Sequence, residues 1–190
     1  YDIYQTYVQT GMGQSMSLAT PENSEAIFTQ NSILKDTFNN LFYHPFWKDS
    51  VLKLKELHDY GERIEDVDFI VGSGHHTNSH FWEEGGYIHQ MPFPYYTPDG
   101  HLDFPPGFED GDNSRFSRKI GLECMSCHNA TPNFVLGSEN KYHNVPEGID
   151  CERCHGPGEL HVQRMLNGEL VDTSIHIDYS IVNPKKLSLE

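Results

Sequence analysis

The hydrophobic pattern changes character several times along the chain and predicts short elements. Residues 31–46 carry apolar side chains at helical spacing, and we expect a helix there that Pro45 ends. Residues 51–60 alternate between apolar and charged side chains, so both a strand and a helix remain open for this segment. Residues 160–166 follow a glycine-rich turn and predict one further helix.

The clearest strand signals lie near the middle of the chain. A short apolar run at residues 67–71 precedes the loop Gly-Ser-Gly-His-His at 72–76. Residues 79–82 and 87–91 flank the turn sequence Glu-Glu-Gly-Gly, which is typical of an antiparallel hairpin. Residues 92–118 are rich in proline, glycine and aromatic residues without any period, and we expect irregular, wrapping chain there.

These signals together predict an α+β fold with low regular secondary structure. It would hold short helices around two cysteine motifs and a small antiparallel hairpin region near residues 66–91. We expect residues 1–110 to form an N-terminal wrapping region and residues 111–190 to carry both motifs, within one integrated domain. With 36% hydrophobic residues, 16 glycines and 11 prolines, the chain is loop-rich for its 190 residues.

All four cysteines belong to two copies of one pattern, Cys-x-x-Cys-His, at residues 124–128 and 151–155. This pattern is typical of haem c attachment, because two thiols at this spacing form thioethers to the haem and the next histidine binds the iron. We therefore expect two covalently attached haems c, which would also compensate for a thin aliphatic core. The residues concerned are Cys124, Cys127 and His128, then Cys151, Cys154 and His155.

Two other interpretations of the cysteines remain open. Two Cys-x-x-Cys pairs also suit a four-thiolate zinc ribbon, although zinc would not require a histidine after each pair. Two disulfides are the other alternative, although a bridge of this short spacing is more often redox-active than structural. The repeated histidine favours haem over both.

Several residues are candidates for the second axial ligand of an iron. Met12 lies between two glycines, and a thioether is a known ligand, although a gap-filling methionine is the more ordinary role. The glycine-rich loop presents His75 and His76, of which we favour His76. His44, beside two aromatic residues, is a weaker candidate.

Two more candidates follow the first motif. His161 lies six residues after His155, too near to reach over the same haem, so we expect it to bind a neighbouring one. His143 is a further candidate of this kind. The basic cluster of Arg115, Arg118 and Lys119 suits either haem propionates or an ordinary surface.

Charge limits the partners that we expect. The formal net charge is −15, from 28 acidic and 13 basic residues, which disfavours nucleic acid and anionic membrane surfaces. No stretch approaches the roughly 20 apolar residues of a membrane span. Haem c is attached outside the cytoplasm, yet no export signal is present, and both ends of the sequence look cut. We therefore expect a piece of a longer protein.

Three segments resemble a family of secreted or periplasmic multihaem c-type cytochromes, often associated with tetratricopeptide repeats. They are VGSGHHTNSHF, PPGFEDGDNSRFSRKIGLECMSCHNATP and GIDCERCHGPGELHV. The resemblance implies haem attachment at both motifs, with His76 and His161 as second ligands and further haems on either side of this stretch. It also implies that Met12 follows another haem motif.

The function expected from these features is electron transfer through two closely spaced haems, in the periplasm or outside the cell. The partners would be other redox proteins or further haem-bearing subunits, including self-assembly. One alternative is a haem enzyme acting on a small nitrogen or oxygen species at an open iron. Another is a haem-bearing subunit of an extracellular filament. We expect a carrier rather than an enzyme, and so no catalytic residue.

Overall fold

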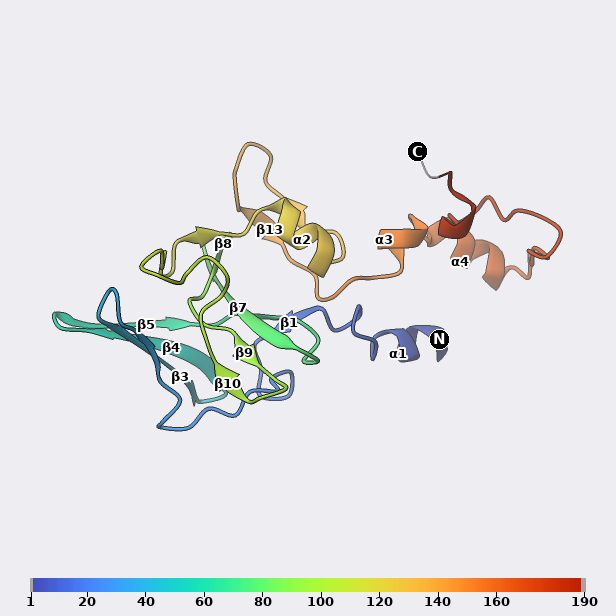
Figure 1. The fold of residues 1–190 in the computed structure, drawn as a ribbon. Coiled ribbons are helices and arrows are strands. Elements are labelled where there is room, and N and C mark those ends of the chain that lie inside the picture. The colour runs from blue at the N-terminus through green and yellow to red at the C-terminus, as the bar shows by residue number, and fades with distance from the viewer. Residues whose placement is uncertain (1, 189–190) are drawn as a thin grey trace. The chain divides into compact units, whose positions relative to one another are not determined.

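The chain divides into two compact units, Tyr1–Ile149 and Asp150–Glu190, of which the computed structural model describes residues 2–188. The division lies between the two cysteine motifs. Figure 1 shows the elements of both units. Within residues 2–188, no helix is long and apolar enough to cross a membrane.

The first unit is built from antiparallel sheets (Figure 1). A four-stranded sheet has the order β2-β3-β4-β5. A larger sheet has the order β1-β6-β7-β8-β11, with β9 paired to β7 and β10 paired to β9. The bounds of the first sheet are β2 Leu34–Asp36, β3 Leu41–Lys48, β4 Val51–His58 and β5 Gly61–Asp66. Those of the second are β1 Met16–Leu18, β6 Phe69–Val71, β7 Thr77–Glu84, β8 Tyr87–Gln90, β9 Tyr95–Tyr96, β10 His101–Leu102 and β11 Arg118–Lys119. The remaining elements are α1 Asp2–Tyr7, α2 Leu122–His128, β12 Asn133–Phe134 and β13 Tyr142–Asn144.

The prediction of a helix over residues 31–46 is wrong, because this segment forms the hairpin of β2 and β3. The Asp36 carboxylate accepts hydrogen bonds from the backbone N–H groups of Phe38 and Asn39, which makes a turn. Asn40 completes it with a φ of 51°. Of the apolar residues that matched a helical period, Leu34 therefore lies in β2, Phe38 in the turn, and Leu41 and Phe42 at the start of β3.

The alternating segment at residues 51–60 is a strand, β4. Leu52 and Leu54 are fully buried, whereas Lys53 and Lys55 on the opposite face are partly exposed. The hairpin expected around Glu-Glu-Gly-Gly is confirmed as β7 and β8, and Gly85 and Gly86 both take positive φ in the turn.

Two hydrophobic cores hold the first unit together. One lies between the sheets and includes Tyr43, Leu54, Trp82 and Phe93. The other joins the larger sheet to the following helix, because Met125 in α2 packs with Met16, Phe69 and Ile88 among others. The first cysteine motif therefore packs on the larger sheet through Met125, which lies between its two cysteines.

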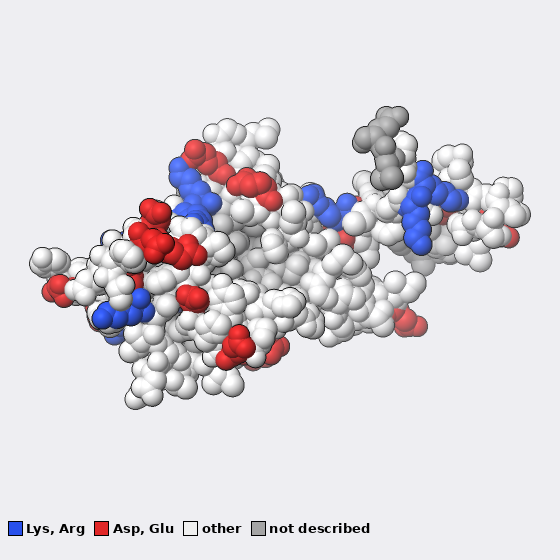
Figure 2. Space-filling view, in the orientation of Figure 1, with Lys and Arg blue, Asp and Glu red and all other residues white. Residues whose placement is uncertain are grey.

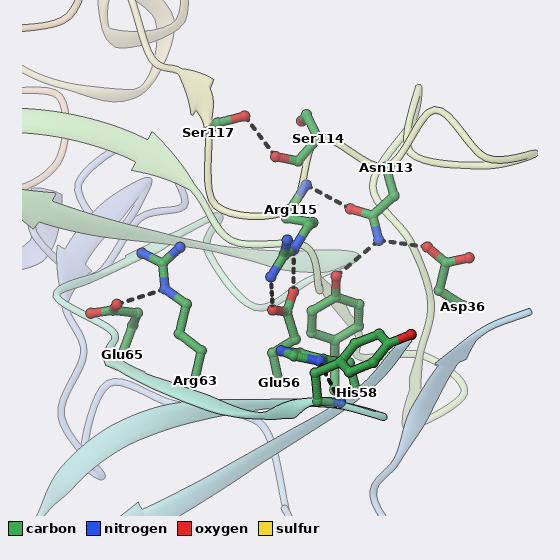
Figure 3. Close-up of polar contacts among 11 residues, drawn as sticks. Asp36, Glu56, His58, Arg63, Glu65, Asn113, Ser114, Arg115 and Ser117 are labelled. Carbon is green, nitrogen blue, oxygen red and sulfur yellow. Dashed lines mark hydrogen bonds and ion pairs between the residues drawn. The ribbon is translucent and has the colours of Figure 1, made fainter. Parts of the chain in front are cut away.

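A polar network ties the chain before this motif to the four-stranded sheet (Figure 3). The Arg115 guanidinium makes a bidentate ion pair with Glu56, whose side chain is fully buried. The amide of Asn113 donates to the Asp36 carboxylate at 2.8 Å and to the Tyr43 hydroxyl at 3.0 Å. Three strands thus position the loop that leads to α2.

The second unit has few regular elements, namely α3 Glu152–His155, α4 Glu159–Leu166 and the 3-10 turn η1 Pro184–Lys186. The helix expected over residues 160–166 is confirmed by α4. The molecule as a whole has the α+β class that the sequence predicted, with short helices around the cysteine motifs and antiparallel strands.

Arg115→Ala tests the polar network. It leaves the buried Glu56 carboxylate unpaired, and we expect the free energy of unfolding to fall by about 3 kcal/mol, the low end for a buried pair because Arg115 is half-exposed. Asp66→Asn removes an exposed partner of Lys53 and should cost about 1 kcal/mol at most. Denaturant unfolding followed by circular dichroism measures both, and equal losses would contradict the assignment.

His80 in β7 predicts an acid sensitivity. Burial lowers the pKa of His80 to about 4, so the unfolded chain takes up a proton between pH 6.5 and about 4 that the folded chain excludes. The free energy of unfolding therefore falls as the pH drops through this window. The loss is about 3 kcal/mol, because each pKa unit corresponds to roughly 1.4 kcal/mol. His80→Phe should lose less stability than the wild type over this window in denaturant titrations. If the free energies of unfolding of the wild type and His80→Phe fell equally with pH, the assignment to His80 would be wrong.

Candidate haem-binding sites

The first motif occupies α2, which begins after Gly121 and ends at His128. Met125 is fully buried and Cys124 packs against the same core, so this side of the helix is fixed. Cys127 and His128 lie on the exposed side. Burial raises the pKa of the Cys124 thiol. The helix thus anchors one cysteine and presents the other with the histidine.

Ser15 connects this helix to two other segments. Its hydroxyl lies 2.8 Å from the carbonyl oxygens of both His128 and Met12 and donates to this pair. Its own carbonyl accepts from the N–H of Gly72 at 2.8 Å. One nearly buried serine therefore holds the Met12 segment, the glycine-rich loop and the first motif together.

The glycine-rich loop is closed by its own side chains and backbone. The Asn78 amide donates to the Gly72 carbonyl at 2.9 Å, and the N–H of Thr97 donates to the His76 carbonyl at 3.0 Å. Gly72 has a φ of 118°, and a Cβ there would lie 2.1 Å from the Thr77 carbonyl oxygen, so only glycine fits. This loop places His75 and His76 beside α2.

A cavity of about 340 Å³ opens where these three segments meet. Its lining includes Cys127 and His128 from the motif, His75 and His76 from the loop, and Met12. The structure therefore brings together five of the residues singled out in the sequence. Imidazole and thioether groups around one hollow suit an axially ligated iron.

Other residues singled out in the sequence lie elsewhere in the first unit. His44 is in β3, where its Nε2 pairs with the Thr29 carbonyl at 3.2 Å, and His143 is exposed in β13. Neither lines the cavity beside α2.

The three basic residues of the cluster have protein partners. Arg115 binds Glu56, Lys119 binds Glu139, and Arg118 donates to the carbonyls of Pro106 and Gly107. The geometry thus favours a structural role over propionate pairing for this cluster.

The second motif occupies the single turn α3. Gly156 ends it with a φ of 69°, and the Glu152 carboxylate accepts from the N–H of Gly158 at 2.7 Å. His155 pairs with Val182, because Nδ1 contacts the Val182 carbonyl at 2.9 Å and the Val182 N–H donates to the His155 carbonyl. A carbonyl can only accept, so Nδ1 carries a proton, and in the neutral imidazole the lone pair is then on Nε2.

His155 lines a cavity of about 440 Å³ whose other walls come largely from residues 177–187. Ile177, Ile181 and Val182 make much of this lining apolar. A volume of several hundred cubic ångströms with an apolar wall and one free imidazole nitrogen is suited to a flat apolar cofactor.

His161 in α4 faces a second, smaller cavity of about 110 Å³, which it shares with His176. Its Nδ1 lies 3.1 Å from the Asp178 carboxylate and 3.1 Å from the Ser180 hydroxyl. Hydrogen bonds from Ser180 lower the pKa of Asp178, so this carboxylate is ionised and accepts the Nδ1 proton. Within residues 2–188, the Nε2 of His161 makes no hydrogen bond.

The cysteine geometry bears on the alternatives to haem. All four thiols are free of disulfides. Among residues 2–188, no three His, Cys, Asp or Glu side chains are arranged to hold a metal ion. The thiols and imidazoles present at each motif fit a haem c.

The sequence analysis missed the residues that orient the ligands. Ser15, Asn129, Val182 and Asp178 were not singled out. Asn129 is fully buried, with its amide bonded to the Pro146 carbonyl, and so fixes the residue after His128. These contacts join positions 17 to 113 residues apart, and no local pattern marks them.

Comparisons with known proteins give one structural likeness. No protein-family model matches the chain, and no curated protein matches it. The fold is similar to the crystal structure of the outer cell wall cytochrome OcwA, with a TM-score of 0.53 and 15% sequence identity. The match covers 94% of this chain and 32% of that one, so this chain spans about a third of its length. At this identity the likeness shows a shared fold.

Ser15→Ala tests the connection at the first site. Loss of the hydroxyl leaves the carbonyls of Met12 and His128 without this donor, and we expect unfolding to become easier by about 1 kcal/mol. Ser117→Ala removes an exposed hydroxyl bonded to the Ser114 carbonyl and should change stability by at most about 0.5 kcal/mol. Thermal unfolding compares the two variants, and equal effects would contradict a special role for Ser15.

Proposed function

We propose that this chain transfers electrons through two covalently attached c-type haems, as part of a multihaem cytochrome. The observation that carries the proposal is that the histidine of each Cys-x-x-Cys-His motif lines a cavity. The shared fold with an outer cell wall cytochrome supports it. A bound haem supplies an iron that gains or loses one electron.

The first haem would be held by Cys124, Cys127 and His128. For its second ligand we assign His76 in preference to Met12. The Met12 and His128 backbones are tied together through the Ser15 hydroxyl, so His76 is the candidate that would hold the iron from a separate segment of chain. His76 lines the same cavity from a different loop.

The second haem would be held by Cys151, Cys154 and His155. The Val182 carbonyl fixes the His155 tautomer that leaves Nε2 for the iron. The apolar residues of segment 177–187 would cover the haem edge and keep water from it.

Charge and fold bear on the partners and the location. On the face drawn in Figure 2, basic side chains form separate groups with acidic and neutral surface between them. With a net charge of −15, the chain offers no continuous basic surface on this face for nucleic acid. We infer a periplasmic or extracellular carrier whose partners are other redox proteins or further haem-bearing subunits.

Haem counting tests the proposal. Expressed with haem c maturation, the chain should carry two haems by the pyridine haemochrome assay, and magnetic resonance should show both low-spin. Cys124→Ala with Cys127→Ala, and separately Cys151→Ala with Cys154→Ala, should each leave one haem. A chain without haem would refute the proposal. A high-spin iron that binds cyanide or nitrite would instead favour the enzyme.

A further inference from the structure

The cavity of about 440 Å³ beside His155 has a single Lys or Arg among its described lining residues, Lys186. A haem is an apolar plate that ends in anionic propionate groups, and an anion in such a site requires a cation or hydrogen-bond donors. In this chain 28 acidic residues face 13 basic ones, so composition alone does not favour a cation here. The rest of the wall is largely apolar, with Pro157, Ile177, Ile181, Val182 and Leu187.

The 3-10 turn η1 connects Lys186 to the partner of His155. The Asn183 side chain accepts from the N–H of Lys185 at 3.2 Å, and the Asn183 carbonyl accepts from the N–H of Lys186 at 2.9 Å. Val182, directly before this turn, is paired with His155 through two hydrogen bonds. The backbone that holds the imidazole therefore also positions the lysine.

The two adjacent lysines of η1 differ in what they face. Lys186 lines the cavity beside His155, whereas Lys185 lines neither this cavity nor the smaller one of the second unit. Both side chains are exposed, and within residues 2–188 neither makes an ion pair. Arg164 of the same unit is, by contrast, already paired with Glu169. The charge of Lys186 is thus available to a group bound in the cavity.

One carboxylate also lines this cavity, that of Asp178. Its Oδ1 accepts from the Ser180 hydroxyl at 2.5 Å, and its Oδ2 lies 3.1 Å from Nδ1 of His161. The protein itself therefore engages the negative charge of Asp178, and the positive charge of Lys186 is left for an anion.

We propose that Lys186 is a positioning residue that pairs with a propionate of the haem held by Cys151, Cys154 and His155, and that it raises the reduction potential of this haem. The inference rests on the proposed function. A haem becomes more negative when it takes up an electron, so a cation beside it stabilises the reduced state. Lys185, which does not line the cavity, has no comparable contact.

The test compares Lys186→Met with Lys185→Met, because each removes one exposed lysine charge from the same turn. Spectroelectrochemical titration of the haem-loaded full chain should show one of its midpoint potentials shifted to more negative values by Lys186→Met. Lys185→Met should give a clearly smaller shift, and Lys186→Arg, which keeps the charge, should restore the wild-type value. Equal shifts from the Lys185 and Lys186 variants would overturn the inference.

Salt separates a contact pair from a general charge effect. Exposed charges are largely screened between about 0.1 M and about 1 M salt, whereas a partly buried pair is screened much less. The shift caused by Lys186→Met should therefore persist at the higher salt concentration, and any shift caused by Lys185→Met should vanish. If both shifts vanished, the pairing of Lys186 with a propionate would be wrong.

Haem content separates failure of this inference from failure of the proposed function. The wild type and all variants should carry two haems by the pyridine haemochrome assay, and a wild type without haem would refute the proposed function. Two haems with both potentials unmoved by Lys186→Met would refute only the role of Lys186. If Lys186→Met does not fold, Lys186→Gln removes the same charge with a polar side chain and is expected to give the same negative shift.

Discussion

The backbone hydrogen bonds around Ser15 are the constraint on which the first site depends. Irregular segments cannot stabilise each other through a ladder, so each must be held by specific donors and acceptors. Ser15 uses its hydroxyl for Met12 and His128 and its carbonyl for Gly72, while the N–H groups of Gly148 and Ile149 donate to the Met16 and Met12 carbonyls. Four stretches of chain that are far apart in sequence thus meet beside one helix.

The two units hold their cysteine motifs in place by different interactions. The buried apolar side chains of the described structure all lie between Met16 and Tyr142, so the first unit rests its motif on a sheet and a core. The second unit fixes its motif mainly by turns and by the pairing of His155 with Val182. Its apolar residues, such as Ile177 and Val182, instead line the cavity beside His155. A covalent haem there would bury the apolar surface that the peptide leaves open.

The sequence predicted features that depend on local rules. The β7–β8 hairpin follows from its Gly85–Gly86 turn, and α4 from its position after glycine. The helix expected at 31–46 failed because a turn at Asp36, made by one side chain, overrides a helical spacing of apolar residues. The turn residues between 36 and 40 were the signal that could have corrected it.

The site residues likewise divide into those that local sequence predicts and those that it does not. The cysteines and the histidine after each pair form a local motif, whereas the groups that orient them come from distant chain. Val182 contributes only a carbonyl, which every residue has, so no residue type can reveal this role. Ser15 and Asn129 are common residues that become partners of the motif through tertiary packing. The sequence therefore identifies the candidate ligands, but it rarely identifies the residues that position them.

Asp172 and Asp178 show how an ordinary local structure becomes specific. Both form one turn with a serine two residues later, with nearly the same distances, and local sequence accounts fully for each. In the second turn, the other carboxylate oxygen of Asp178 lies against His161 in α4. The sequence supplies the carboxylate of Asp178, and the packing makes it a hydrogen-bond acceptor for His161.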